Sequence, residues 1–167
     1  MEEMRVQIEA REPTDGEIRA FWFTLPIDTE QVEELLGIDI DTDYYSITGK
    51  ELPFADEVRE DTTILELNEL YEMYQRLPDS IRQEYKAFLV YYENLEELYN
   101  YRNEILSYPD CKSMIDVARQ KAKTDPAFRD LSEDCQEYYF DYEAYADDLK
   151  ANGRFIETEH GIFEIPE

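Results

Sequence analysis

The sequence contains few of the residues on which most catalytic sites depend. It has one histidine, two cysteines and five glycines among 167 residues. His160 precedes Gly161, and this position is better explained by a tight turn than by a general base. The glycines are too scattered for a phosphate-binding loop, and the motifs HExxH, GxSxG and CxxC do not occur. We therefore expect neither an enzyme nor a bound cofactor.

The stretch from Asp39 to Lys50 begins like a calcium-binding loop but lacks two residues that such a loop requires. Asp39, Asp41 and Asp43 alternate like the first ligands of an EF-hand. Such a loop then needs a glycine at its sixth position and a glutamate at its twelfth. Those positions hold Tyr44 and Lys50. We therefore expect no metal site here.

Long apolar runs are also absent. No stretch approaches the length of a membrane-spanning helix, and the opening residues MEEMRVQIEAR lack the basic and apolar regions of a signal peptide. Cys111 and Cys135 have no metal-type spacing and fall in segments expected to be helical, so we expect free thiols. These features predict a cytoplasmic protein without a membrane partner.

Basic residues are scarce beside acidic ones. The chain has 16 Lys and Arg against 42 Asp and Glu, a formal charge of −26. Residues 1–62 hold 18 acids and 5 bases, residues 63–108 hold 9 and 4, and residues 109–167 hold 15 and 7. The charge is thus spread over the chain and is not an acidic tail. Because 43% of the residues are hydrophobic and 14% aromatic, the chain is expected to fold.

Apolar periodicity and capping signals predict an α+β fold of three small units. We expect an N-terminal β-rich α+β unit at 1–62, a helical bundle unit at 63–108, and a C-terminal α+β unit at 109–167 that ends in a hairpin. In the first unit, Asp28 with Gln31 marks the start of a helix at 29–36, and Gly37 its end. Its strands are expected at 5–10, 20–25 and 44–48.

Three helices are expected in the central unit. Thr63 and Glu66 form a capping box for the first helix, and Pro78 ends it. Ser80 is expected to cap a second helix that reaches about Tyr92. Asn94 and Glu97 can cap the third helix, which is expected to bury Leu95, Leu98, Tyr99, Ile105 and Leu106.

The C-terminal unit is expected to contain a helix at 114–123, one long helix at 132–151, and a hairpin with strands at 154–158 and 162–165. In the long helix, a 3.6-residue period puts one set of side chains on the packed face and the acids on the other. The packed set is Cys135, Tyr138, Tyr139, Tyr142, Ala146 and Leu149.

Acidic side chains recur at helical spacing, and no Lys or Arg occurs between Arg129 and Lys150. Like charges three or four residues apart on a helix repel each other. We name the acids that follow this pattern, with the three aspartates above, the candidate acids. They are Asp39, Asp41, Asp43, Glu66, Glu69, Glu72, Glu93, Glu97, Glu104, Asp130, Glu133, Asp134, Glu137, Asp141 and Asp148.

Four interpretations of the candidate acids stay open at this point. They form a solvated surface, an adaptation to high salt, a binding surface for divalent cations, or a copy of the phosphate charges of nucleic acid. Duplex DNA carries about one charge per 1.7 Å of axis, so a charge of −26 corresponds to roughly 44 Å of duplex. The last interpretation predicts a protein that binds other proteins and no nucleic acid.

Four segments, in order, resemble the ArdA antirestriction proteins, the DNA mimics carried by plasmids and conjugative transposons. The segments are AFWFTLPID, ELPF, IDVAR and DYEAYADDLKANGRFIETEHGIFEI. The resemblance implies an elongated homodimer of three small domains per chain. It also implies carboxylates placed like the phosphates of bent B-form DNA, which occupy the DNA groove of type I restriction-modification enzymes and block cleavage. It implies no catalysis and no cofactor.

An alternative function is an acidic adaptor or chaperone that binds one basic protein without copying DNA. Competition with DNA separates the two, since an adaptor can bind outside the DNA groove.

The closing hairpin also predicts a homodimer. Neighbouring residues of a strand face opposite sides, yet Phe155 and Ile156 are both apolar, as are Ile162 and Phe163. We expect one face of the hairpin to pack on the chain's own helices and the other on a second copy. The alternative is that a single chain buries both faces.

Overall fold

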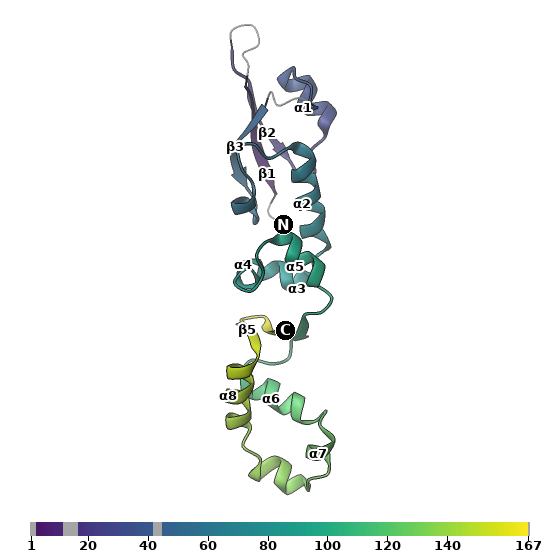
Figure 1. Ribbon diagram of the computed structural model, residues 1–167, viewed down its shortest axis with the longest axis vertical. Coiled ribbons are helices and arrows are strands. Elements are labelled where there is room, and N and C mark those ends of the chain that lie inside the picture. The colour runs from purple at the N-terminus through teal and green to yellow at the C-terminus, as the bar shows by residue number, and fades with distance from the viewer. Residues whose placement is uncertain (1–2, 12–16, 42–44, 167) are drawn as a thin grey trace. The chain divides into compact units, whose positions relative to one another are not determined.

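A computed structural model describes residues 3–11, 17–41 and 45–166. The chain divides into two compact units, Met1–Tyr99 and Asn100–Glu167 (Figure 1). The first unit contains β1 (Arg5–Ala10), β2 (Ala20–Thr24), α1 (Thr29–Leu36), β3 (Tyr45–Glu51), the 3₁₀ turn η1 (Ala55–Glu57), α2 (Ile64–Arg76), α3 (Asp79–Gln83), α4 (Tyr85–Phe88) and most of α5 (Leu95–Tyr101). The fold class is α+β, as predicted.

The first unit is built on an antiparallel sheet in the order β2-β1-β3. Alternate side chains of β1 are buried, because one face of the sheet packs against the interior of the unit. Val6, Ile8 and Ala10 belong to that face. Figure 1 shows α1 and α2 beside this sheet. The predicted strands at 5–10 and 20–25 are confirmed, with β2 ending one residue earlier.

The local signals for α1 and α2 are confirmed. The Asp28 carboxylate accepts a hydrogen bond from the Glu30 amide at the start of α1, and Gly37 ends it with a left-handed φ of 67°. At α2, the Thr63 hydroxyl accepts from the Glu66 amide and the Glu66 carboxylate accepts from the Thr63 amide. Both helices therefore begin and end where the sequence predicts.

Hydrogen bonds connect α2 to the strands and loops that precede it. The Tyr45 hydroxyl accepts from the Ile64 amide at 3.1 Å. The Asn68 amide group accepts from the Ile27 amide and donates to the Ile27 carbonyl. These bonds cross the predicted boundary between residues 62 and 63. The division into three units stays a prediction.

The helix predicted from Ser80 to Tyr92 is wrong. Two short helices, α3 and α4, occupy this stretch, and Pro78 takes the N-cap position of α3 instead of Ser80. The backbone between them leaves the helical region at Glu84, with φ −114°. Tyr85 then packs edge-on against Tyr74, and its hydroxyl donates to Glu57. These tertiary contacts outweigh continuation of the helix.

The second unit contains a three-stranded antiparallel sheet in the order β4-β6-β5. Its elements are β4 (Leu106–Tyr108), α6 (Met114–Ala122), α7 (Pro126–Arg129), the π-helical turn η2 (Cys135–Tyr139), α8 (Tyr142–Asn152), β5 (Arg154–Thr158) and β6 (Gly161–Ile165). The predicted hairpin is confirmed. The assignment of Leu106 to a buried helical position is wrong, because it lies in β4 and is 54% exposed.

The helices α6 and α8 pack against each other (Figure 1). The buried cluster between them draws side chains from both helices, from β4 and from β6. It comprises Tyr108, Cys111, Met114, Val117, Ala118, Ala146 and Ile162, with Tyr145, Leu149 and Phe155 partly buried at its edge.

The single long helix predicted at 132–151 is wrong. η2 ends at Tyr139, Phe140 is extended, and Asp141 caps a new helix by accepting a hydrogen bond from the Ala144 amide. The Phe140 ring packs edge-on against Phe128 with 5.0 Å between centroids. A capping carboxylate and an aromatic contact thus stabilise the break.

The hairpin residues predicted to face a second copy are not exposed. Ile156, Ile162 and Phe163 are 7%, 1% and 1% exposed, and Phe155 is half-buried. The argument that led from this hairpin to a homodimer is therefore wrong in its premise of an exposed apolar face.

Within the described residues, no helix is both long and apolar enough to cross a bilayer.

Candidate acidic interface

The candidate acids lie at the surface of both units. Of those that the structure describes, Glu97 is half-buried and every other one is exposed. Asp43 lies outside the described residues. No aspartate or glutamate in the described ranges is buried, and the buried polar side chains there are Ser46 and Thr62. The acid is therefore available to a partner and does not support the core.

Basic side chains compensate other acids. The ion pairs seen between described residues are Arg5–Glu51, Arg82–Asp79, Lys121–Glu164 and Lys150–Glu157. None of these four acids belongs to the candidate acids. The sparse basic residues therefore leave most of the candidate acids without an ion pair, although Glu72 lies close enough to Arg76 to help raise the pKa of that guanidinium.

Some candidate acids have a structural role, which the charge pattern alone did not reveal. Each of these carboxylates accepts a short-range hydrogen bond, at a helix cap, a turn or a helix end. They are Asp39, Glu66, Glu97, Asp141 and Asp148. Substituting them would change stability as well as surface charge.

The other candidate acids have no such role. Their side chains make no hydrogen bond or ion pair to another residue of the described ranges. They are Asp41, Glu69, Glu72, Glu93, Glu104, Asp130, Glu133, Asp134 and Glu137. Glu69 and Glu72 lie three residues apart on the uninterrupted helix α2, which places their side chains about 5–6 Å apart. Asp130, Glu133, Asp134 and Glu137 form a second run, before and within η2.

The break at Phe140 corrects the predicted acidic face of the C-terminal helix. Asp141 and Asp148 belong to α8, while the acids from 130 to 137 belong to the preceding segment. The prediction that these six acids share one face of a single helix is therefore wrong. The break also exposes Tyr138 and Tyr139, which the sequence had placed on the packed face, at 74% and 81%.

A shallow hollow on the first unit gathers carboxylates that the sequence did not single out. It has a volume of about 210 Å³ and lies between α2, the end of η1 and the start of α5. Glu57 and Glu96 line it together with Glu66 and Glu69. The Glu57 carboxylate accepts from the Tyr85 hydroxyl and the Leu95 amide, which fixes its position.

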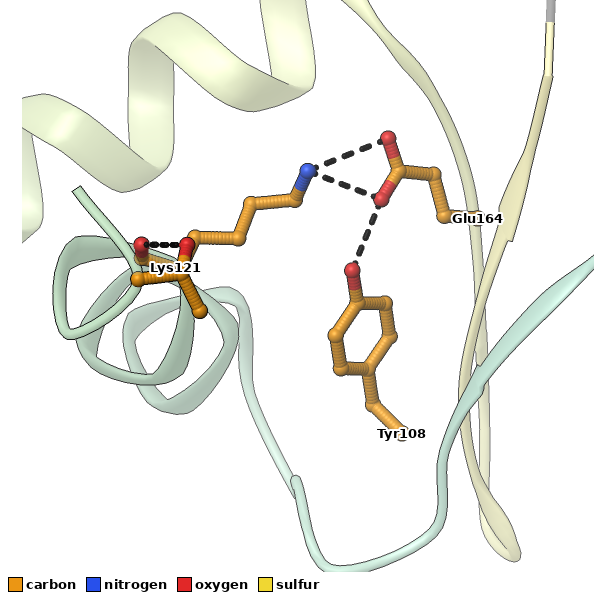
Figure 2. A network of polar contacts seen from close by, with 4 residues as sticks. Tyr108, Lys121 and Glu164 are labelled. Carbon is orange, nitrogen blue, oxygen red and sulfur yellow. Dashed lines mark hydrogen bonds and ion pairs between the residues drawn. The ribbon is translucent and has the colours of Figure 1, made fainter.

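A polar network on the second unit is structural. The Glu164 carboxylate accepts a hydrogen bond from the Tyr108 hydroxyl at 2.8 Å and pairs with the Lys121 ammonium at 2.9 Å (Figure 2). Burial and the bond to Glu164 raise the pKa of Tyr108 above its ordinary value. The network ties α6 to β4 and β6.

The single histidine and the two cysteines are the side chains most often used in catalysis or metal binding. His160 is exposed and lies in the hairpin turn between β5 and β6. Cys111 is buried and Cys135 half-buried, and both are free thiols, as predicted. Burial raises the pKa of Cys111, which lowers its reactivity. Within the part of the chain that the structure describes, no group of three or more His, Cys, Asp or Glu side chains could hold a metal ion.

The fold and this surface define a class of small α+β protein whose main surface feature is exposed, uncompensated acid. Residues 14–164 match the family model of the antirestriction protein ArdA. The chain belongs to this family. A search of curated proteins found no match. Membership implies antirestriction through interaction with restriction-modification enzymes, in a family of non-catalytic inhibitors.

Proposed function

We propose that the protein mimics the charge track of B-form DNA and occupies the DNA-binding groove of a type I restriction-modification enzyme. Occupation of the groove blocks cleavage of unmodified DNA. Modification requires the same groove, so a methylation assay with the same enzyme tests whether it is inhibited as well. The protein acts in the cytoplasm, where the enzyme meets incoming DNA.

The observation that supports this proposal is the exposure of the candidate acids without compensating bases. A groove that binds DNA carries basic side chains and gains affinity from neutralising phosphates. A carboxylate surface on a folded protein offers the same groove negative charges at fixed positions. Because Glu69 and the acids from Asp130 to Glu137 have no structural bonds, they are available to pair with those bases.

Inhibition of cleavage tests the proposal. The protein is mixed with a type I enzyme near stoichiometry, and ATP-dependent cleavage of an unmodified plasmid is followed on gels. We expect cleavage to stop, and the enzyme to release a labelled recognition duplex in the same concentration range. Full cleavage with each of several type I enzymes would contradict the proposal. Inhibition without release of the duplex would favour the acidic adaptor.

Variants with neutralised acids test whether the enzyme binds particular carboxylates or responds only to the net negative charge of the protein. The test variant changes four acids without structural bonds to their amides, and spares Asp141, which caps α8. Its substitutions are Asp130→Asn, Glu133→Gln, Asp134→Asn and Glu137→Gln. The control removes four exposed acids outside the candidate set by Glu34→Gln, Asp56→Asn, Glu60→Gln and Asp61→Asn.

We expect the test variant to lose about tenfold or more in affinity for the enzyme, and the control to lose less, although both remove four charges. Affinity should also fall as salt rises, because screening weakens contacts between exposed charges. Equal losses in the two variants would show that only net charge matters. One substitution that abolished inhibition in a folded variant would favour a local contact, and so the adaptor.

We also propose that the protein acts as a homodimer, as the resemblance to the family implies. The hairpin side chains cannot supply the contact, since Ile162 and Phe163 are buried. Sedimentation velocity in moderate salt tests the proposal. A single monomeric species at micromolar concentration would refute it.

A further inference from the structure

The two edges of the sheet in the first unit differ in how they are covered. At β3, the Ile47 amide donates to the Glu60 carbonyl at 2.9 Å, and the Lys50 ammonium donates to the Val58 carbonyl. The residues after η1 therefore cover this edge. β2 forms the other edge, because the strand order is β2-β1-β3. An uncovered edge strand presents backbone donors and acceptors with which another strand can pair.

Two hydrogen bonds fix which backbone groups of β2 face the outer edge. The Ala10 amide donates to the Arg19 carbonyl, and the Leu25 amide donates to the Met4 carbonyl, both at 2.9 Å. Along an antiparallel pair of strands, residues that bond to the opposite strand alternate with residues that do not. In this register the odd-numbered residues from 19 to 25 bond to β1, and the even-numbered ones direct their N–H and C=O groups outward.

The outward residues of β2 are Ala20, Trp22 and Thr24. Within the described ranges, no backbone hydrogen bond joins their N–H or C=O groups to another segment. The helix α1 packs beside β2 but does not close this edge. Phe21 lies on the same face of the sheet as the buried Phe23, yet it is 40% exposed, and a helix over the edge would bury it.

The Trp22 side chain also leaves the edge open. Its ring reaches across β1 to Gly49 of β3, where an added Cβ would lie 2.9 Å from the ring. The Arg5 guanidinium lies 4.9 Å from the ring centroid and pairs with the Glu51 carboxylate. The ring is therefore held over the middle of the sheet, and it points away from the outer edge of β2.

The outward groups match an extended polypeptide, which presents N–H and C=O groups at the same spacing. Nucleic acid and lipid offer no such alternation. Edge strands in proteins are commonly protected from pairing by a charge or a proline within the strand. The stretch AFWFTLPI, residues 20–27, contains no charged residue, and β2 itself contains no proline. Nothing in the strand therefore opposes the addition of another strand.

Acids surround this uncharged strand. Residues 17–36 hold five acids and one base, Arg19, whose guanidinium donates to the Leu35 carbonyl at 3.4 Å. The Glu3 carboxylate accepts from the Thr24 hydroxyl at 3.4 Å, which places an acid at the end of β2. The local charge favours a cationic segment and disfavours a second copy of this chain, whose charge is −26.

We infer that β2 is a docking edge for an extended cationic segment of a protein partner, which adds a fourth strand to the sheet. The backbone groups of Ala20, Trp22 and Thr24 bond to the segment, and the surrounding acids attract its basic side chains. Assignment of the segment to the type I enzyme rests on the proposed function. The edge adds main-chain hydrogen bonds to a surface that otherwise recognises charge.

The first experiment measures amide hydrogen exchange by NMR in the full chain, with and without an octapeptide of alternating arginine and valine. In the free protein, the Trp22 and Thr24 amides should exchange faster than those of Phe21 and Phe23. With about nine-tenths of the protein bound, they should slow by about tenfold, since they then exchange mainly from the free state. The Ile47 amide, which already has a partner, should not change.

Two outcomes of this experiment would overturn the inference. One is that the arginine–valine peptide leaves the Trp22 and Thr24 amides unprotected. The other is that these amides are protected in the free protein and lose protection on dilution, which would show that a second copy occupies the edge. The octapeptide of alternating glutamate and valine is the charge control and should protect neither amide.

The second experiment removes outward donors without removing a bond to β1. The test variant is Ala20→Pro/Thr24→Pro, and the matched control is Ala20→Val/Thr24→Val, which keeps both N–H groups. We expect the test variant to bind the labelled arginine–valine peptide about tenfold more weakly than wild type, because two backbone hydrogen bonds are lost. The control should bind like wild type. Equal affinities of the two variants would overturn the inference.

Far-UV circular dichroism verifies that both variants are folded. If the double proline variant does not fold, Thr24→Pro is compared with Thr24→Val in the same assay. The expected loss is then about threefold, for one hydrogen bond. No loss in this single variant would overturn the inference.

Inhibition of the type I enzyme by the same variants tests the assignment of the segment to that enzyme. If wild type inhibits, we expect the double proline variant to need about tenfold more protein for half-inhibition, with the valine variant close to wild type. Equal inhibition by the proline variant would overturn the assignment and leave the proposed function intact. Failure of wild type to inhibit would remove the proposed function, and the peptide experiments would then decide the inference.

Discussion

Removal of the Lys121 ammonium should shift the local opening equilibrium of the second unit toward the open state. The Lys121 and Glu164 side chains are 27% and 22% exposed, so the ion pair lies between a surface pair and a buried one. Lys121→Met keeps most of the aliphatic stem and deletes the charge, which lies 6.0 Å from the centroid of the Phe155 ring. The Glu164 carboxylate keeps the Tyr108 hydroxyl as its donor. The variant therefore loses the ion pair with Glu164 and the weaker contact of the ammonium with the Phe155 ring.

The expected cost follows from this partial burial. Breaking a fully buried pair costs about 3–5 kcal/mol and an exposed pair contributes about 0–1 kcal/mol. With water reaching about a quarter of each side chain, we expect about 1–2 kcal/mol, equivalent to about a tenfold change in an opening equilibrium.

Hydrogen exchange with mass spectrometry provides the measurement, because it reports the two units separately in the full chain. Peptides from α6 and β6 should exchange about tenfold faster in Lys121→Met, and peptides from β1 should be unchanged. Lys150→Met is the matched control, since the Lys150–Glu157 pair is more exposed, at 60% and 43%. Similar exchange in both variants would refute the argument from burial.

Three further predictions concern stability. Burial and Glu164 raise the pKa of Tyr108, so the unfolded chain loses this proton at a lower pH than the folded chain. The free energy of unfolding should therefore fall above about pH 10. Tyr108→Phe should reduce that fall, as measured by urea titrations at alkaline pH. Thr63→Ala should cost about 1 kcal/mol by removing the cap of α2, with Thr63→Ser close to wild type in thermal unfolding. Gly161→Ala should lower the melting temperature, since φ is 132° there and an added Cβ would lie 3.0 Å from the Pro109 Cα; an unchanged melting temperature would contradict this reasoning.

The elements that the sequence predicts correctly depend on neighbours along the chain. Asp28 and Gly37 delimit α1, and the Thr63–Glu66 pair caps α2, through hydrogen bonds that span a few residues. Exposure of the candidate acids is also local in origin, because a carboxylate without a partner cannot be buried cheaply. Their surface position was therefore predictable one residue at a time.

The wrong predictions concern elements whose conformation depends on contacts with residues far away in the sequence. β4 is only three residues long and exists because it pairs with β6, more than fifty residues later in the chain. The periodicity of residues 132–151 suits a single helix, yet Phe140 packs against Phe128 and Asp141 caps α8. Helical periodicity contains no information about such contacts.

The sequence by itself determined the charge, the α+β class and the individual helix caps, because each of these follows from residue type or from neighbours within one turn. Tertiary structure decided which acids are engaged in capping and which are free. It also decided that Tyr138 and Tyr139 face solvent while Phe140 and Tyr142 pack. The physical reason is that a break of one or two residues rotates every later side chain about the helix axis. Only long-range packing determines whether that break forms.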